Sequence, residues 1–69
     1  MKKVKWIDDD NIICVADIRS WNEITNSGIA NYYRKGKLYA PLQKFILKED
    51  DIEISEEEFN KYLENEGNI

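Results

Sequence analysis

Basic side chains that could contact phosphates are concentrated between residues 24 and 48, where five positive residues occur without a single negative one. These five are Arg34, Lys35, Lys37, Lys44 and Lys48. Residues 1–23 carry four positive and five negative groups, and residues 49–69 carry one positive and nine negative groups. The chain therefore combines a net charge of −4 with a strongly basic middle third, which predicts an anion-binding surface in that third.

Polar residues within this third follow the spacing of one helix face, on a helix predicted for residues 26–35. The outer stripe of that helix and its flanks are formed by Asn26, Ser27, Ala30, Asn31, Arg34 and Lys35. In a DNA major groove, Asn can bond bidentately to adenine, Ala can touch a thymine methyl group, and Arg suits guanine or phosphate. An ordinary solvated helix face is the alternative interpretation of the same pattern.

Cues at both ends predict the helix over residues 26–35. Ile24 and Ile29 occupy the two positions of a hydrophobic staple. Lys35 and Gly36 supply a basic last turn and a residue suited to the left-handed conformation that closes many helices. The inward side of this helix would carry Ile29, Tyr32 and Tyr33.

The segment before this helix supports two interpretations. The apolar run of residues 12–15 is typical of a strand, whereas Val15, Ile18 and Trp21 have the three-to-four spacing of a helix. We expect a helix over residues 15–22, because the staple needs a packed neighbour close by. Further upstream, the sequence predicts a short first strand or extended arm, followed by a turn at residues 8–11.

The remaining chain predicts a hairpin and a final helix. Residues 43–48 and 52–54 would pair around an acidic tip, with apolar side chains on one face. Ser55 and Glu58 form a capping box, so the last helix is expected at about residues 56–65. The predicted core consists of Val15, Ile18, Trp21, Ile24, Ile29, Tyr33, Leu38, Phe45, Leu47, Ile52, Ile54, Phe59 and Leu63.

This order of elements resembles the winged helix-turn-helix of the MerR and phage-excisionase group. The stretch VADIRSWNEITNSGIANYYRKGKL is similar to its first two helices, and FILKEDDIEISEEEFNKYL is similar to its wing and following short helix. The resemblance implies a small α+β winged helix-turn-helix fold that binds DNA as a single domain over residues 1–69. It implies groove contacts by Thr25, Asn26, Ser27, Ala30 and Asn31, phosphate contacts by Arg34, Lys35 and Lys37, and wing contacts by Lys44 or Lys48.

The expected function is sequence-specific binding of double-stranded DNA by a phage or mobile-element protein, either an excisionase-like architectural factor or a transcriptional regulator. A module of this size makes few base contacts, so a homo-oligomer on DNA is expected. The alternative is a phage-encoded inhibitor or DNA mimic that presents an acidic C-terminal surface to a basic protein partner. That surface would be formed by Glu56, Glu57, Glu58, Glu64 and Glu66, together with the acidic wing tip at residues 49–51.

The residue inventory argues against an enzyme or a metal protein. The chain has one cysteine and no histidine, so an internal disulfide, a cysteine zinc cluster and a histidine base are all excluded. Cys14 is expected to be a buried small hydrophobe, and no cofactor is expected. The longest apolar run, residues 12–16, is too short for a signal peptide or a membrane span, so we expect a cytoplasmic protein without a membrane partner.

Overall fold

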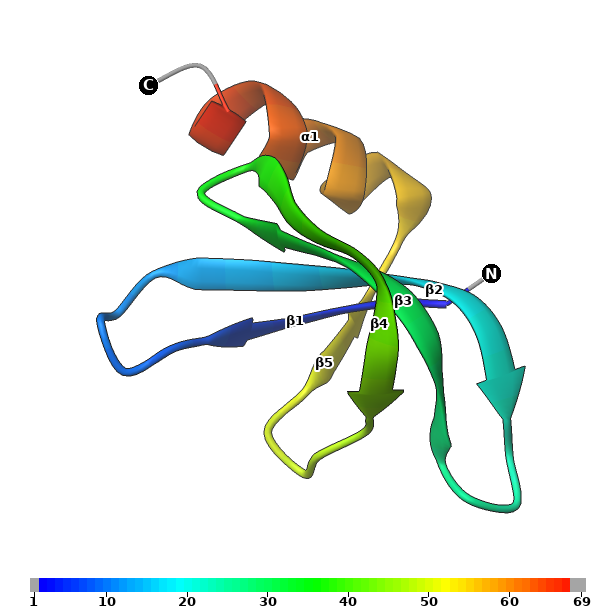
Figure 1. Cartoon of the computed structure of the whole chain (residues 1–69). Coiled ribbons are helices and arrows are strands. Elements are labelled where there is room, and N and C mark those ends of the chain that lie inside the picture. The colour runs from blue at the N-terminus through cyan, green and yellow to red at the C-terminus, as the bar shows by residue number, and fades with distance from the viewer. Residues whose placement is uncertain (1, 68–69) are drawn as a thin grey trace.

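The computed structural model describes residues 2–67, which form a five-stranded antiparallel sheet and a C-terminal helix (Figure 1). The elements are β1 (Lys3–Ile7), β2 (Ile13–Asn22), β3 (Ser27–Arg34), β4 (Lys37–Ile46), β5 (Ile52–Ile54) and α1 (Glu56–Gly67). The strand order is β4-β3-β2-β1-β5, so the first four strands form a meander and β5 returns to pair with β1. The predicted winged helix-turn-helix is therefore wrong.

The helix predicted over residues 15–22 is wrong because this segment forms most of β2. Five successive residues, 14–18, are buried, which means that the strand is covered on both faces. The buried run is apolar except for Asp17, so the strand lacks the clear period of two that a half-buried strand shows. The helical spacing of Val15, Ile18 and Trp21 is therefore a coincidence of a doubly covered strand.

The helix predicted over residues 26–35 is also wrong, because these residues form the end of the β2–β3 turn, β3 and the start of the next turn. The Asn22 side chain accepts a hydrogen bond from the Ile24 amide at 2.9 Å and closes the turn before β3. At the other end, Lys35 and Gly36 have φ angles of 54° and 73°, as in the two-residue turn that favours hairpins. The basic residue and glycine that predicted a helix end instead close a β-hairpin.

The predicted wing hairpin is wrong in its pairing. Residues 43–46 belong to β4, which pairs with β3, and β5 pairs with β1 on the other side of the sheet. The two segments are therefore separated by three strands of the sheet order. Between them, the backbone amide of Lys48 donates to the Asp51 carboxylate at 2.8 Å and holds the connecting loop.

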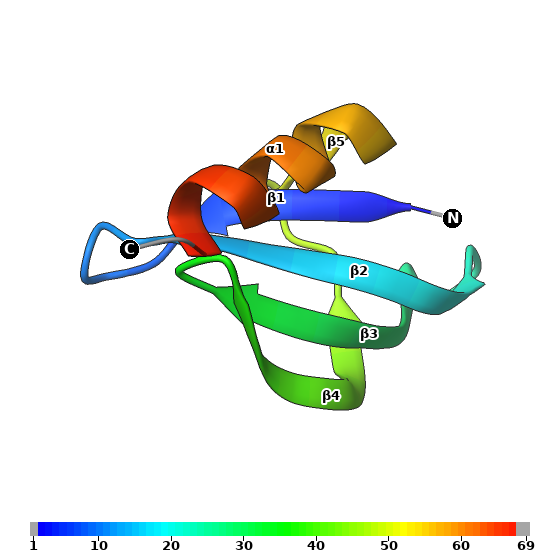
Figure 2. The same cartoon turned by 90° about the horizontal axis from the view of Figure 1, so that it is seen from above.

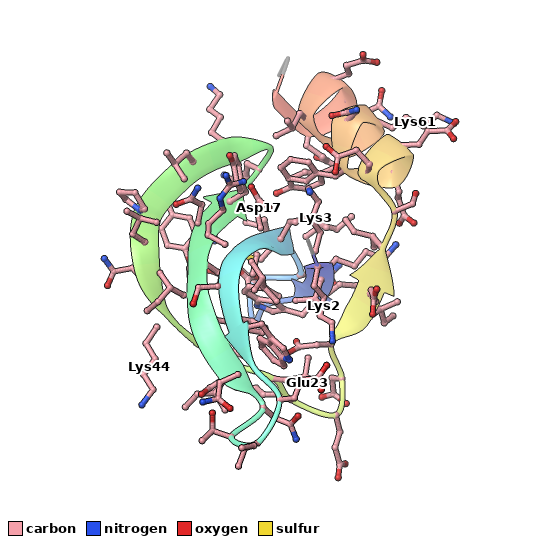
Figure 3. All side chains as sticks on the ribbon, turned by 90° about the vertical axis from the view of Figure 1, so that its right-hand side faces the viewer. Lys2, Lys3, Asp17, Glu23, Lys44 and Lys61 are labelled. Atoms are coloured by element: carbon pink, nitrogen blue, oxygen red, sulfur yellow. The ribbon has the colours of Figure 1, made fainter. Side chains whose placement is uncertain are left out.

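The sheet is strongly curved, and its concave face holds the first core (Figures 1 and 3). The Trp6 ring of β1 lies 6.2 Å from the Phe45 ring of β4, although two strands separate β1 from β4 in the sheet. Only a sheet that curls around this face allows that contact. The core is built from Val4, Ala16, Ile18, Ala30 and Phe45, with Trp6, Trp21, Tyr32 and Leu47 packed against it.

The opposite face of the sheet is covered by α1, which forms the second core (Figure 2). The amide of Glu58 donates to the Ser55 hydroxyl at 3.1 Å, so Ser55 caps the helix as predicted and the final helix is confirmed. The Glu58 carboxylate, which would complete a capping box, instead pairs with Lys5 at 2.7 Å. The Tyr62 hydroxyl donates to the Ile13 carbonyl at 2.9 Å and accepts from the Gly36 amide at 3.0 Å. This core consists of Val15, Ile54, Phe59 and Tyr62, with Tyr33 and Leu63 against it.

Other local predictions had mixed outcomes. The first strand is confirmed as β1, and residues 8–11 form the predicted turn. The burial of Cys14 is confirmed. Four residues placed in the predicted core are instead exposed, because their helices or hairpin do not exist. These are Ile24, Ile29, Leu38 and Ile52.

Candidate nucleic-acid interface

The ten residues predicted to contact DNA lie along two neighbouring strands and their turns. Thr25 and Asn26 are in the β2–β3 turn, and Lys35 is in the β3–β4 turn. The others lie on β3, on β4 or in the loop that follows β4. The structure thus gathers most of the basic middle third at one edge of the sheet, where β4 is the outermost strand.

Most of the residues predicted to read base edges make contacts within the protein, whereas Asn26 is exposed in the β2–β3 turn. Ala30 is 0% exposed in the concave core. The Asn31 side chain accepts a hydrogen bond from the Leu42 amide at 2.9 Å and holds a bulge of β4. The Thr25 and Ser27 hydroxyls bond each other at 2.7 Å. The recognition helix that was to insert these side chains into a major groove is absent from residues 26–35, which leaves their contact with DNA a prediction.

Arg34 is committed to an internal network at one end of the concave face. Its Nε donates to Asp8 at 2.9 Å, and its Nη2 donates to Asp10 at 3.1 Å. The hydrogen bond from Arg34, supported by the amides of Ile12 and Asp10, lowers the pKa of Asp8 below its ordinary value. Two carboxylates therefore offset the guanidinium charge, which makes Arg34 a poor phosphate ligand.

Four lysines of the basic third remain without a carboxylate partner. They are Lys35, Lys37, Lys44 and Lys48. Each is exposed, and none forms an ion pair with a carboxylate of residues 2–67. In Figure 3, the Lys44 side chain leaves β4 toward solvent on the side of the molecule opposite to Lys61 of α1.

The acidic first turn of α1, by contrast, is paired with cations of the same chain. Glu56 lies 2.6 Å from the Lys3 ammonium, and Glu58 lies 2.7 Å from that of Lys5. Lys3 is buried beside Asp17 between the sheet and α1 (Figure 3), and its hydrogen bond to Glu56 raises its pKa. The helix therefore uses these glutamates to dock on β1.

An open hollow of about 530 Å³ lies where the β1–β2 turn, the β3–β4 turn and the end of α1 meet. It is lined by Asn11, Ile12, Ile13, Arg34, Lys35, Lys37 and Glu66. Lys35 and Lys37 give it a basic rim, whereas Glu66 adds an opposing charge. This hollow extends the basic edge of the sheet toward the helix but is not a purely cationic site.

The sequence pattern predicted no binding role for the aromatic residues beside the basic edge. Tyr32 and Tyr33 were placed on one helix face, but in β3 they point to opposite faces of the sheet. Tyr32 joins the concave face, where its ring lies 5.9 Å from Trp6 and 6.2 Å from Tyr39 of β4. The alternation of a strand would have revealed this arrangement if residues 27–34 had been assigned to a strand.

Cys14 is the single cysteine of the chain, and it is buried. Burial raises the pKa of the Cys14 thiol to about 11, so the sulfur stays protonated at neutral pH and is a weak nucleophile. Among the described residues, no three histidine, cysteine or acidic side chains lie close enough together to hold a metal ion. Within the same residues, α1 lacks the length and apolar character of a membrane-crossing helix.

Comparison with known proteins gives no relative from which a function could be transferred. No protein-family model, no curated protein and no solved structure matches the chain. The MerR and excisionase resemblance depended on two helices that are strands in the structure, so it no longer supports a family assignment.

Proposed function

We propose that this chain is a small nucleic-acid-binding protein that holds phosphates with the lysines at the β4 edge of its sheet and performs no catalysis. The supporting observation is the contrast between the two charged regions. The four lysines of the basic third are exposed and have no described carboxylate partner, whereas the glutamates of the first turn of α1 are all in ion pairs. Lysines that are free to bind phosphates are the basis of sequence-independent binding.

The same contrast counts against a DNA mimic built on α1. Such a mimic would need carboxylates that project toward a basic partner. Glu56, Glu57 and Glu58 instead lie within ion-pair distance of Lys3, Lys61 and Lys5, respectively. Acidic side chains also occur in the loop before β5, but one of them, Asp51, is bonded to the Lys48 backbone.

Binding by phosphate contacts alone is weak, so two or more copies along one nucleic acid molecule are part of the proposal. DNA remains the expected ligand. We place the protein in the cytoplasm, where a reducing environment suits its single free thiol.

The proposal is tested by replacing lysines one at a time and measuring binding to mixed-sequence DNA. We expect Lys37→Ala and Lys44→Ala to weaken binding by a similar factor on every sequence, because each removes one phosphate contact. Lys61→Ala is the matched control, since Lys61 is also exposed but faces Glu57 at 3.5 Å. Fluorescence anisotropy at low salt measures all three variants.

Equal effects of the three substitutions would contradict this proposal, because they would show only a response to net charge. Loss of binding on charge reversal of Glu57, with no effect of Lys37→Ala or Lys44→Ala, would favour a protein that acts through its acidic helix.

A further inference from the structure

We infer that the preferred ligand is single-stranded nucleic acid, whose unpaired bases stack on a row of three rings formed by Trp6, Tyr32 and Tyr39. This inference rests on the proposed function and specifies the ligand of the same edge of the sheet. The three rings come from β1, β3 and β4, and their centroids lie 5.9 Å apart for Trp6 and Tyr32 and 6.2 Å apart for Tyr32 and Tyr39. They will be called the ring row.

The ring row passes from the core into solvent. Phe45, which contacts both Trp6 and Tyr32, is buried and anchors the row to the concave core. Trp6 and Tyr32 are partly buried, and Tyr39 at the outer end is 56% exposed. Neighbouring rings of the row meet edge to face, with interplanar angles of 76°, and the exposure of Tyr39 makes this ring the one most open to a base.

A hollow of about 260 Å³ lies against the inner part of the ring row. Its aromatic lining comes from Trp6, Tyr32 and Phe45, and its charged lining comes from Lys44, Lys48 and Asp51. The Tyr32 hydroxyl donates to the Lys44 carbonyl at 2.8 Å, which fixes the ring beside β4. The hollow thus has aromatic walls, and Lys44 and Lys48 are among the residues that line it.

Lysines also border the outer end of the ring row. Lys37 precedes Tyr39 by two residues on β4, and the same strand carries Lys44. Asp51 is the opposing charge in the hollow, and its carboxylate already accepts a hydrogen bond from the Lys48 backbone. The edge strand β4 therefore carries one ring of the row, Tyr39, together with two lysines that could hold the phosphates of a bound strand.

Such a surface discriminates single strands from duplexes by a simple physical criterion. In a duplex the base faces are stacked on each other, so protein rings cannot reach them without unpairing. In a single strand every base has a free π-face, and stacking on an aromatic side chain adds to the attraction of the lysines for phosphates.

The test compares one fluorescent mixed-sequence DNA oligonucleotide in single-stranded and duplex form by anisotropy. The substitution is Tyr39→Ala, which removes an exposed ring without opening the core. Leu42→Ala is the matched control, because Leu42 lies on the same strand and is 64% exposed but has no ring. Thermal melting verifies that both variants remain folded.

We expect wild-type protein to bind the single strand more tightly than the duplex. Tyr39→Ala should weaken single-strand binding at least about fivefold, the lower end of the effect of losing one stacked base. Duplex binding should be unchanged, Leu42→Ala should match wild type, and Tyr39→Phe should restore most of the lost affinity because it keeps the ring.

Two results would overturn the inference in distinguishable ways. If duplex binds as tightly as single strand and Tyr39→Ala has no effect, the ring row is not a stacking surface, although phosphate binding by the lysines stands. If neither form binds at low salt, both the stacking inference and the proposed function fail.

Discussion

Lysine side chains in this protein fall into two groups, according to whether a carboxylate lies within reach. Lys3 and Lys5 of β1 meet glutamates more than fifty residues later in the chain, at 2.6 and 2.7 Å. Lys37 and Lys44 meet none among the described residues. The sequence shows that the middle third is basic, but it cannot show which cations are free, because the pairing partners are brought together only by the fold.

Asp8 connects the stability of the fold to pH. Its carboxylate accepts hydrogen bonds from Arg34 and from the amides of Asp10 and Ile12, and its pKa is lowered from 3.8. A carboxylate with a lowered folded-state pKa stabilises the fold above its unfolded pKa, and this stabilisation is lost as pH falls through the folded value. We therefore expect Asp8→Asn to melt at a lower temperature than wild type at pH 7. The difference in melting temperature should shrink as pH falls below about 4, because the wild-type carboxylate becomes protonated there.

Asp9→Asn is the control for this experiment, because Asp9 is exposed and forms no described ion pair. Melting followed by circular dichroism between pH 3 and pH 7 measures both variants. A constant difference between Asp8→Asn and wild type across that range would show that the charge of Asp8 does not stabilise the fold.

Phe59 and Ile29 distinguish the observed fold from the predicted one. Both belonged to the predicted core, but Phe59 is buried under α1 with its ring 5.2 Å from Tyr33, whereas Ile29 is 38% exposed. We expect Phe59→Ala to cost about 3–5 kcal/mol of unfolding free energy, because it leaves a cavity. Ile29→Ala should cost less than about 1 kcal/mol. Urea denaturation measures both, and similar losses would contradict the assignment of β3.

Among the elements, those specified by residues close together in the sequence were predicted correctly. Ser55 and Glu58 specify the start of α1 with their own hydrogen bond, and residues 8–11 form a turn through the Asp8 side chain. The helices predicted over residues 15–22 and 26–35 failed for another reason. β2 is buried on both faces by parts of the chain far away in sequence, and β3 is fixed by pairing with β2 and β4. The spacing of apolar residues alone does not show that distant parts of the chain will cover both faces of a strand.

Gly28 allows β2 and β3 to approach each other beyond the bulge between Ile18 and Ser20. A Cβ atom at Gly28 would lie 1.9 Å from the carbonyl oxygen of Ser20, which belongs to the backbone and cannot rotate away. We expect Gly28→Ala to destabilise the protein by about 1–3 kcal/mol through forced separation of the strands. Thermal or urea unfolding measures this loss.

Ser27→Ala is the matched control for the glycine substitution, since it changes the adjacent residue of β3 and removes only a hydroxyl bonded to Thr25. Stabilities of Gly28→Ala and Ser27→Ala that are equal to each other would argue against the close approach of β2 and β3.

For the whole molecule, the fold separates in space the basic residues of the β4 edge and the acidic residues in the first turn of α1. At the β4 edge, Lys37 and Lys44 have no carboxylate partner among residues 2–67. On α1, which covers one face of the sheet (Figure 2), Glu56 and Glu58 are paired with lysines of β1. The basic character of residues 24–48 predicted where the candidate site lies. The roles given to Ala30 and Asn31 depended on a helix that the sheet replaces.

The salt dependence of DNA binding tests the central claim that the free lysines of the basic third hold phosphates. The measurement is the dissociation constant for a mixed-sequence oligonucleotide over a range of salt concentrations, for wild type and for a variant with Lys35, Lys37, Lys44 and Lys48 all replaced by Ala. Four phosphate contacts predict a log–log slope of about −3 for wild type, with single strands somewhat shallower than duplexes. The slope of the variant should approach zero as its affinity falls. If the wild type does not bind at low salt, or if the slope of the variant is unchanged, the four lysines do not hold phosphates.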